Sequence, residues 1–280
     1  MVRHIRPKTL ADALAFLADD PFCLMAGGTD VMVQKRSMAG VEPDYGRDVL
    51  YIRDLSELKG IHHDGSSVRI GAAEPLENIL GDPYVPKLLR MAVADIASPA
   101  IRHMATIGGN IGNASPAGDT LVALHVLDAC VVLASQSGKR SLPIRNVITG
   151  VRKTAIRDDE LIEAVVVPSV PYTSVSWTKV GTRRANALSK VAFAGLVLLE
   201  GDVIKDFRMA FGAVSPTIVR DRTIEKTVIG HKVSDLTTIL KKTLEAYDRV
   251  ISPIDDQRSD AAYRRQAAMN LARDFIEQID

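Results

Sequence analysis

The stretch ATIGGNIGNASPAGD at residues 105–119 constrains the fold more than any other feature of the chain. It is rich in glycine, asparagine and other turn-forming residues, and no charged side chain appears before Asp119. A long apolar segment, LVALHVLDACVVLA, follows at once. Because glycine, asparagine and proline favour turns over regular elements, we expect residues 105–119 to form a loop that leads into a buried segment.

A second glycine pair lies near the start of the chain, in FCLMAGGTDVMVQKR. We expect a short strand over 22–26, a turn at Gly27-Gly28 and a helix that opens near Thr29–Asp30. Glycine lets a backbone take positive φ and approach a ligand closely. A run of free N–H groups in such a turn, beside the start of a helix, can cradle a diphosphate.

Neutral donors accompany both glycine pairs, whereas neither turn contains a lysine or arginine. The pattern therefore predicts binding by backbone N–H groups rather than by fixed charges. A plain tight turn with no ligand is the alternative that these residues leave open. The neutral donors are Thr29, Thr106, Asn110 and Ser115.

The common catalytic and nucleotide motifs do not occur. There is no GxGxxG or GxxxxGK[ST], which excludes the usual dinucleotide fingerprint and the P-loop, and there is no HExxH zinc motif. Two cysteines, Cys23 and Cys130, lie in apolar runs, and we expect both to be buried thiols in a reducing compartment. Two cysteines are too few for a cubane iron–sulfur cluster, which generally takes four.

Length and charge indicate the general class. The chain has 280 residues, enough for one large or two smaller domains, and its net charge of +1 favours neither nucleic acid nor an anionic membrane. No apolar run approaches the roughly 20 residues that a membrane span needs, so we expect a cytoplasmic protein. The proline-rich segment at 167–174 is the best candidate for a linker and predicts two parts, 1–170 and 171–280.

Hydrophobic periodicity predicts an alternation of helices and strands. Helices are expected near 10–17, 75–80, 83–96, 118–128, 234–250 and 259–278. Strands are expected at 48–55, 129–134 and 159–168, together with a hairpin that turns at Asp64-Gly65 and strands on both sides of a turn at Gly201-Asp202.

Two segments carry a resemblance to a known family. LMAGGTDVMVQ and SPAIRHMATIGGNIGNASPAGD resemble the FAD-binding medium subunit of molybdenum hydroxylases, the family of xanthine dehydrogenase and carbon monoxide dehydrogenase. The resemblance covers nearly the whole chain, from RPKTLADALAFLAD through DELIEAVVVP, WTKVGTRRANALSKV and FRMAFGAVSPTIVR to SDAAYRRQAAMNLARDFI. It implies an α+β fold, with a PCMH-type FAD-binding domain over 1–170 that has two α/β subdomains, about 1–56 and 57–170. A small α/β C-terminal domain of the CO dehydrogenase flavoprotein type would then occupy 171–280.

The resemblance also implies a set of cofactor-binding residues. The family places the pyrophosphate on both glycine segments, gives Asp119 to cofactor hydroxyls and puts Lys179 near the flavin. Ile96 and Ile162 correspond to apolar contacts, one near the adenine and one near the flavin. Trp177 lies where relatives often carry an aromatic ring against the isoalloxazine, and a core tryptophan is the open alternative. The full set is Leu24, Met25, Ala26, Gly27, Gly28, Thr29, Asp30, Val31, Ile96, Thr106, Ile107, Gly108, Gly109, Asn110, Ser115, Asp119, Ile162, Trp177 and Lys179, with no catalytic residue and no metal ligand.

The function implied is electron transfer within a multi-subunit oxidoreductase. This chain would carry FAD, a large subunit would carry molybdopterin, and a small subunit would carry [2Fe–2S] clusters. Electrons would pass from those clusters to the FAD and on to NAD, oxygen or another acceptor. Two alternatives remain: a free-standing flavin-dependent oxidoreductase, and a cofactor-free scaffold that kept the fold.

Overall fold

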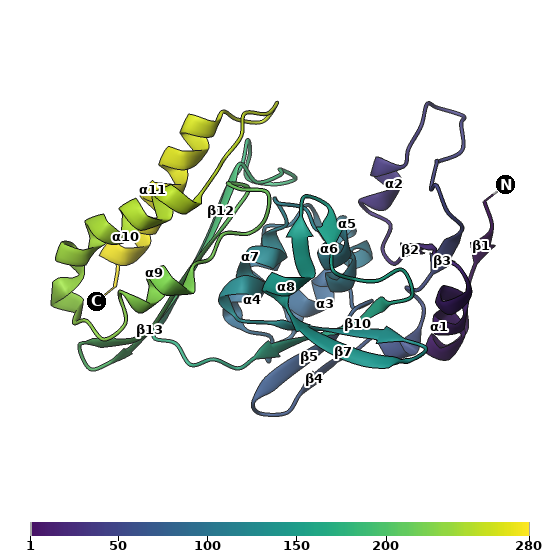
Figure 1. Cartoon of the computed structure of the whole chain (residues 1–280), viewed down its shortest axis with the longest axis horizontal. Coiled ribbons are helices and arrows are strands. Elements are labelled where there is room, and N and C mark those ends of the chain that lie inside the picture. Colours follow the sequence, from purple (N-terminus) through teal and green to yellow (C-terminus); the bar gives the residue numbers. More distant parts are fainter. Residues whose placement is uncertain (1, 280) are drawn as a thin grey trace. The chain divides into compact units, whose positions relative to one another are not determined.

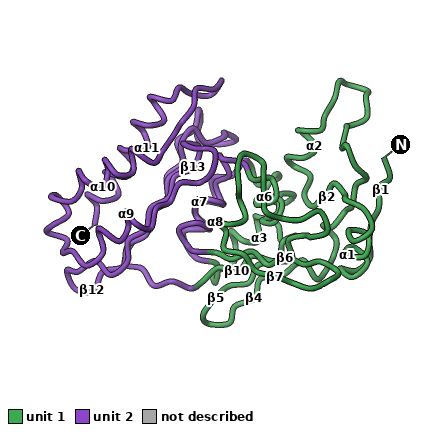
Figure 2. Tube along the Cα trace, viewed as in Figure 1, with its two compact units in different colours: residues 1–85, 98–114, 129–168 green, residues 86–97, 115–128, 169–280 purple. Residues whose placement is uncertain are grey.

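The computed structural model describes residues 2–279, which form two compact units (Figure 1, Figure 2). The chain passes between the units several times before residue 170. The first unit, green in Figure 2, comprises the residues up to 85 with 98–114 and 129–168, and the second, purple, comprises 86–97, 115–128 and the residues from 169 onward. The domain boundaries expected at 56 and 170 remain a prediction.

A parallel three-stranded sheet and two helices begin the first unit. Helix α1 starts where the sequence predicts, because Thr9 and Asp12 form a reciprocal capping box at its first turn. Its inner side, with Ala13 and Leu17, packs in a core with Leu50 of the sheet. The elements are β1 (His4–Ile5), α1 (Leu10–Asp19), β2 (Cys23–Met25), α2 (Val31–Gln34) and β3 (Val49–Tyr51), and the strand order is β1-β3-β2.

A five-stranded antiparallel sheet follows in the same unit. The predicted hairpin at Asp64-Gly65 is confirmed: Gly65 has φ +87° and Asp64 accepts hydrogen bonds from the N–H groups of Ser66 and Ser67. The strands, in the order of the sheet, are β4 (Ile61–His63), β5 (Ser67–Gly71), β10 (Leu161–Pro168), β6 (Cys130–Ser135) and β7 (Gly138–Pro143).

Short helices complete the first unit, and one of them lies where the sequence predicted a loop. Residues 107–113, expected to be loop, form helix α6, which contacts strands β5 and β10. Thr106 is its N-cap, and Ala114, at φ +46°, ends it. The other elements are a 3₁₀ helix (Ser56–Leu58), α3 (Leu76–Gly81), α5 (Pro99–Met104), α8 (Ile144–Val147), β8 (Ile148–Gly150) and β9 (Lys153–Thr154).

The second unit is built on an antiparallel sheet with the order β11-β12-β13. Phe193, Phe207 and Phe211 of this sheet form a core with Phe275 of α11. Helices α4 and α7 contact the same sheet. The elements are α4 (Lys87–Ala94), α7 (Asp119–Val126), β11 (Ser174–Val180), β12 (Val191–Glu200), β13 (Val203–Gly212), α9 (Arg222–Lys226), a 3₁₀ helix (Val233–Asp235), α10 (Leu236–Val250) and α11 (Ala261–Glu277).

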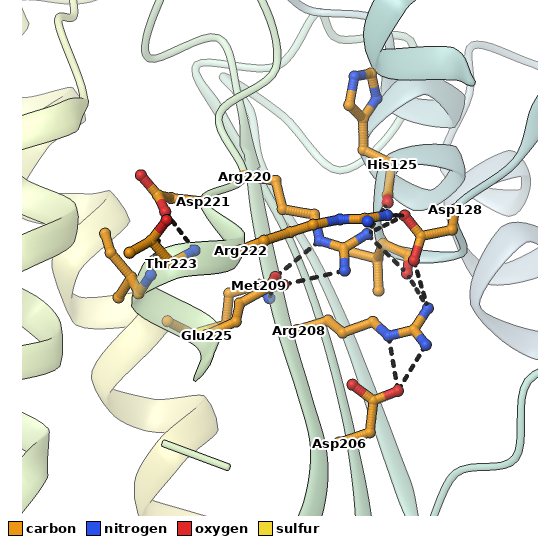
Figure 3. A network of polar contacts seen from close by, with 12 residues as sticks. His125, Asp128, Asp206, Arg208, Met209, Arg220, Asp221, Arg222, Thr223 and Glu225 are labelled. Atoms are coloured by element: carbon orange, nitrogen blue, oxygen red, sulfur yellow. Dashed lines mark hydrogen bonds and ion pairs between the residues drawn. The ribbon is translucent and has the colours of Figure 1, made fainter. Parts of the chain in front are cut away.

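A network of charged groups fastens the end of α7 within the second unit (Figure 3). Asp128 pairs with Arg208 at 3.2 Å and with Arg220 at 2.9 Å. Both guanidinium groups also donate to the carbonyl of Val126, which lies in the last turn of the helix and so has no partner within it. Glu225, which is buried, completes the network by accepting from Arg220 at 2.8 Å. These contacts explain why 115–128 belongs to this unit although its sequence lies before residue 170.

Two expectations about the whole chain can be compared with the structure. Cys23 and Cys130 are free thiols, but both are partly exposed rather than buried. Within residues 2–279, no helix combines the length and apolarity needed to cross a membrane.

Candidate functional site

A cavity of about 510 Å³ lies in the first unit, where the two glycine segments meet. It brings together most of the residues predicted to hold the diphosphate, although they come from segments about eighty residues apart. The predicted residues that line it are Leu24, Ala26, Gly27, Gly28, Thr29, Asp30, Val31, Thr106, Gly108, Gly109, Asn110 and Ile162.

The turn between β2 and α2 offers unpaired backbone donors to this cavity. Gly28 takes φ +71°, the left-handed conformation that favours glycine. Gly27 lies against the chain at Met104, so closely that an added Cβ would be 2.0 Å from the Met104 carbonyl oxygen. Among residues 2–279, no acceptor pairs with the N–H groups of the five residues 27–31. Successive unpaired N–H groups in such a turn form a concave anion-binding site.

The glycine segment at Gly108-Gly109, which is the second along the chain, differs from the expectation. We expected free N–H groups here as well, but the first turn of α6 uses all of its own. Gly109 donates to the Thr106 hydroxyl at 3.0 Å, and Asn110 donates to the Thr106 carbonyl at 3.0 Å. Gly108 donates to the Ala72 carbonyl at 2.9 Å. The reason is that these residues open a capped helix packed on the sheet, and such a helix must satisfy its first N–H groups.

The two glycines of this segment also have separate reasons to lack a side chain. A Cβ on Gly108 would lie 2.7 Å from both the Cβ and the carbonyl oxygen of Ala72, so the helix approaches the chain just after β5 closely only because glycine is there. A Cβ on Gly109 would meet only the Thr106 hydroxyl, at 3.0 Å. Gly108 is therefore required by packing, whereas Gly109 leaves space on the side of the cavity.

Three arginines that were not predicted from the sequence also line the cavity. They are Arg47, Arg152 and Arg157. Arg47 pairs with Asp158 at 2.8 Å, and Arg152 lies 3.4 Å from Asp30. Neither glycine turn contains a lysine or arginine, so the positive charges at the cavity come from other parts of the chain. No signal in the local sequence indicates this, since Arg152 lies more than a hundred residues from Asp30.

The remaining predicted residues do not line this cavity. Met25 and Ile107 are buried in the core of the first unit. The others belong to the second unit and are Ile96, Ser115, Asp119, Trp177 and Lys179.

Within the second unit, Asp119 and Lys179 form a buried ion pair. The Lys179 Nζ lies 2.6 Å from Asp119 Oδ2 and 2.8 Å from the Asp95 carbonyl oxygen. Asp119 Oδ1 accepts from the Ser189 hydroxyl at 2.6 Å. Trp177 is 9% exposed and donates from Nε1 to Asp95 Oδ2 at 2.9 Å. The structure therefore brings three of the predicted residues together, and it adds Asp95 and Ser189, which the sequence analysis did not name.

Burial dominates the electrostatics of Asp119. It raises the pKa of this carboxyl group, because an ionised group loses hydration inside the protein. Lys179 and then Ser189 oppose the rise by stabilising the carboxylate. Beyond their mutual contact, Lys179 is held by the Asp95 carbonyl and Asp119 by the Ser189 hydroxyl.

Models of two protein families match this chain. The FAD-binding domain of molybdopterin dehydrogenases matches residues 1–170, and the C-terminal domain of CO dehydrogenase flavoproteins matches residues 177–279. The chain belongs to the FAD-binding medium subunits of the molybdenum hydroxylases. The expected α+β fold, with a two-part FAD-binding domain and a small C-terminal domain, is confirmed.

Individual relatives resemble the chain over nearly its full length. The glyceraldehyde dehydrogenase medium chain of Sulfolobus acidocaldarius is 30% identical over 99% of this chain and 97% of its own length. The xanthine dehydrogenase FAD-binding subunit of Escherichia coli is 31% identical over 98% of this chain and 94% of its own. The solved structure of reconstituted CO dehydrogenase from Oligotropha carboxidovorans superposes with a TM-score of 0.88, at 26% identity over 99% of this chain and 97% of that one.

Membership of this family establishes the general role of the chain. It carries an FAD-binding domain and is a subunit of an oxidoreductase. The unpaired N–H groups at 27–31 and the arginines at the cavity suit the diphosphate of that cofactor.

Proposed function

We propose that this chain is the FAD-carrying electron-transfer subunit of a multi-subunit molybdenum hydroxylase. In this proposal it takes electrons from [2Fe–2S] clusters of a small partner subunit and passes them to NAD or another acceptor. The observation that carries it is the cavity of the first unit, where five successive backbone N–H groups have no acceptor among residues 2–279. Residues 27–31 are partly buried at the cavity wall, and successive unpaired N–H groups in such a turn form a concave surface that suits an anionic ligand.

The residues of the cavity would bind and orient the cofactor. The turn at 27–31 would hold the diphosphate through its N–H groups, and Ile162 would contribute an apolar wall. Gly109 would leave the space that the ligand needs. When bound, FAD would supply the redox chemistry, because flavins accept and release electrons reversibly.

The residues of the second unit are assigned to the cofactor by the family resemblance, except Ser115, which the sequence indicates as a neutral donor beside the glycine pair. We propose that Asp119 meets cofactor hydroxyls, that Lys179 lies near the flavin, and that Ile96, Ser115 and Trp177 contact the cofactor. The buried pair of Asp119 and Lys179 supports a role for a fixed charge here, since its hydrogen bonds hold both groups in one orientation.

Partner subunits would supply the other redox groups. The sequence has two cysteines, whereas an iron–sulfur cluster generally takes four cysteine ligands, so we place the clusters on a small subunit and the molybdopterin on a large one. The names of the relatives agree with this division, because they are called medium chains or FAD-binding subunits.

The test is to purify the chain with its partners and record its visible spectrum before and after denaturation. We expect FAD in a one-to-one ratio with this chain, and flavin reduction by an organic substrate only when the partners are present. Reduction of the isolated chain by an organic substrate would favour a free-standing flavin oxidoreductase. A complex without any flavin would favour a scaffold and would overturn the proposal. Anaerobic addition of NADH then tests the acceptor, since NADH reduces the flavin if NAD is the physiological partner.

A further inference from the structure

Arg152 occupies an unusual position at the edge of the cavity. It is the second residue of the two-residue connection between β8 and β9, and its side chain is 48% exposed. It lines the cavity together with the Gly27–Val31 turn, to which it is connected through Asp30 at 3.4 Å.

The backbone of Arg152 is strained. Its φ is +55°, a left-handed conformation that glycine or asparagine adopts more easily in a tight hairpin. A long charged side chain does not stabilise such a turn. Residues held in sparsely populated conformations tend to mark functional sites, so the strain favours a function for this side chain.

The surrounding residues fix the position of the guanidinium group. The Arg152 N–H donates to the carbonyl of Ala114, where α6 ends, at 3.0 Å. The Arg152 Nη1 donates to Asn113 Oδ1 at 2.8 Å, and Gln34 Nε2 donates to the same oxygen at 2.8 Å. Gln34 also bonds Asp30. The hairpin, α2 and the end of α6 are thus joined by one set of contacts around the cavity.

The guanidinium keeps donors for a ligand. Both side-chain hydrogen bonds of Arg152 involve Nη1, and its Nε and Nη2 groups bond no acceptor within residues 2–279. Arginine presents these donors in a planar fork that matches the oxygens of a phosphate. Asp30 is also significant here, because its carboxylate would repel an anion in the cavity unless a cation stood beside it.

We propose that Arg152 is a ligand of the FAD diphosphate and supplies the positive charge that the two glycine segments lack. It compensates Asp30 through Nη1 and donates to phosphate oxygens through Nε and Nη2. Asn113 and Gln34 are positioning residues, since they hold the guanidinium and the carboxylate in place. The inference rests on the proposed function in one respect, namely that the anion is the diphosphate of FAD.

The experiment measures binding of FAD and of riboflavin to the flavin-free form of the full chain, through quenching of flavin fluorescence. Riboflavin shares the ring and the ribityl chain of FAD but has no phosphate. The variants are R152Q, R152K and the matched control R145Q, which removes an exposed arginine of the same unit that lies outside the cavity. Thermal melting of each flavin-free variant checks that the fold is retained.

We expect R152Q to weaken FAD binding by about tenfold or more, because it removes charged hydrogen bonds to the ligand. R152Q should leave riboflavin binding unchanged and make FAD binding less sensitive to salt. R152K should recover part of the loss, and R145Q should behave as the unaltered chain.

Two results would overturn the inference while the proposed function stands. One is that R152Q binds FAD within about twofold of the unaltered chain, a difference too small for a lost charged contact. The other is an equal loss of FAD and riboflavin, which would mean that Arg152 only maintains the shape of the cavity. If the unaltered chain itself took up no FAD, alone or with its partners, the proposed function would fail as well.

Discussion

Replacing Gly109 with valine should weaken FAD binding by roughly a hundredfold and leave the fold intact. A Cβ at this position meets only the Thr106 hydroxyl, at 3.0 Å, and this hydroxyl also accepts the Gly109 N–H as the cap of α6. The protein without ligand therefore accepts valine at the expense of a small shift in the cap, which the better helix propensity of valine partly offsets. We expect the free energy of unfolding to fall by no more than about 1 kcal/mol. The isopropyl group, however, would occupy space on the cavity side of α6 that the ligand needs.

The expected loss of affinity follows from the cost of overpacking. Forcing extra carbon atoms into an occupied space costs about 1–3 kcal/mol, and a rigid diphosphate in contact with backbone has little freedom to move away. At about 3 kcal/mol, FAD binding would weaken by roughly a hundredfold. A fluorescence titration with FAD and a thermal melt of the flavin-free chain measure the two effects separately.

Gly108→Ala provides the matched comparison, because its neighbour is backbone rather than cavity. A Cβ there would lie 2.7 Å from the Ala72 carbonyl oxygen, so α6 and β5 would have to separate. We expect a loss of about 1–3 kcal/mol in the free energy of unfolding even without flavin. If Gly109→Val bound FAD within about twofold of the unaltered chain, or if it unfolded as readily as Gly108→Ala, the assignment of Gly109 to the ligand side would be wrong.

Three further predictions concern charged groups. Lys179→Met should destabilise the chain by about 3–5 kcal/mol, since it leaves Asp119 buried without its cation. Burial raises the folded-state pKa of Asp119, so protonation of this carboxyl group favours the folded form. The difference in free energy of unfolding between Lys179→Met and the unaltered chain, measured in urea, should therefore shrink as pH falls. A difference that did not change with pH would contradict this. Glu225→Gln should lower the free energy of unfolding, measured by thermal melting, by about 3 kcal/mol, because the buried Arg220 loses its anionic partner. Lys226→Gln, the control, should leave it almost unchanged. Hydrogen bonds from Ser66 and Ser67 lower the pKa of Asp64 to about 2, so its stabilising effect is present above its ordinary pKa of 3.8 and is lost as pH falls through about 2. Carboxyl NMR titration checks this, and Ser66→Ala should raise the value.

Local sequence signals predicted the elements that depend on local chemistry. The helix after Thr9 begins at its capping box, and the hairpin at Asp64-Gly65 turns where glycine allows φ +87°. The strand that ends at Pro168 and the C-terminal helices α10 and α11 also lie within a few residues of their expected bounds. In each case a cap, a turn residue or a long amphipathic period marks the element within its own segment.

Helix α6 was missed because tertiary packing overrides its composition. Glycine and asparagine are poor helix formers, so Ile107–Asn113 has the propensity of a loop. The helix forms because Thr106 caps it and because Gly108 lets it lie against Ala72, with Ile107 and Ile111 buried. None of these contacts with β5 can be inferred from the local pattern, since the partner strand lies more than thirty residues earlier.

The charge of the site was missed for a related reason. The two glycine segments contain no cation, and the sequence analysis therefore assigned binding to backbone donors alone. The fold brings Arg152 beside Asp30 from the β8–β9 hairpin, and it removes the free N–H groups of the second segment by making that segment a helix. In the proposed anion site, one turn would supply the N–H groups, one helix would leave the space, and a distant hairpin would supply the cation. A site of this kind depends on residues that approach only in the folded chain, so a local motif marks the turn and the space but never the charge.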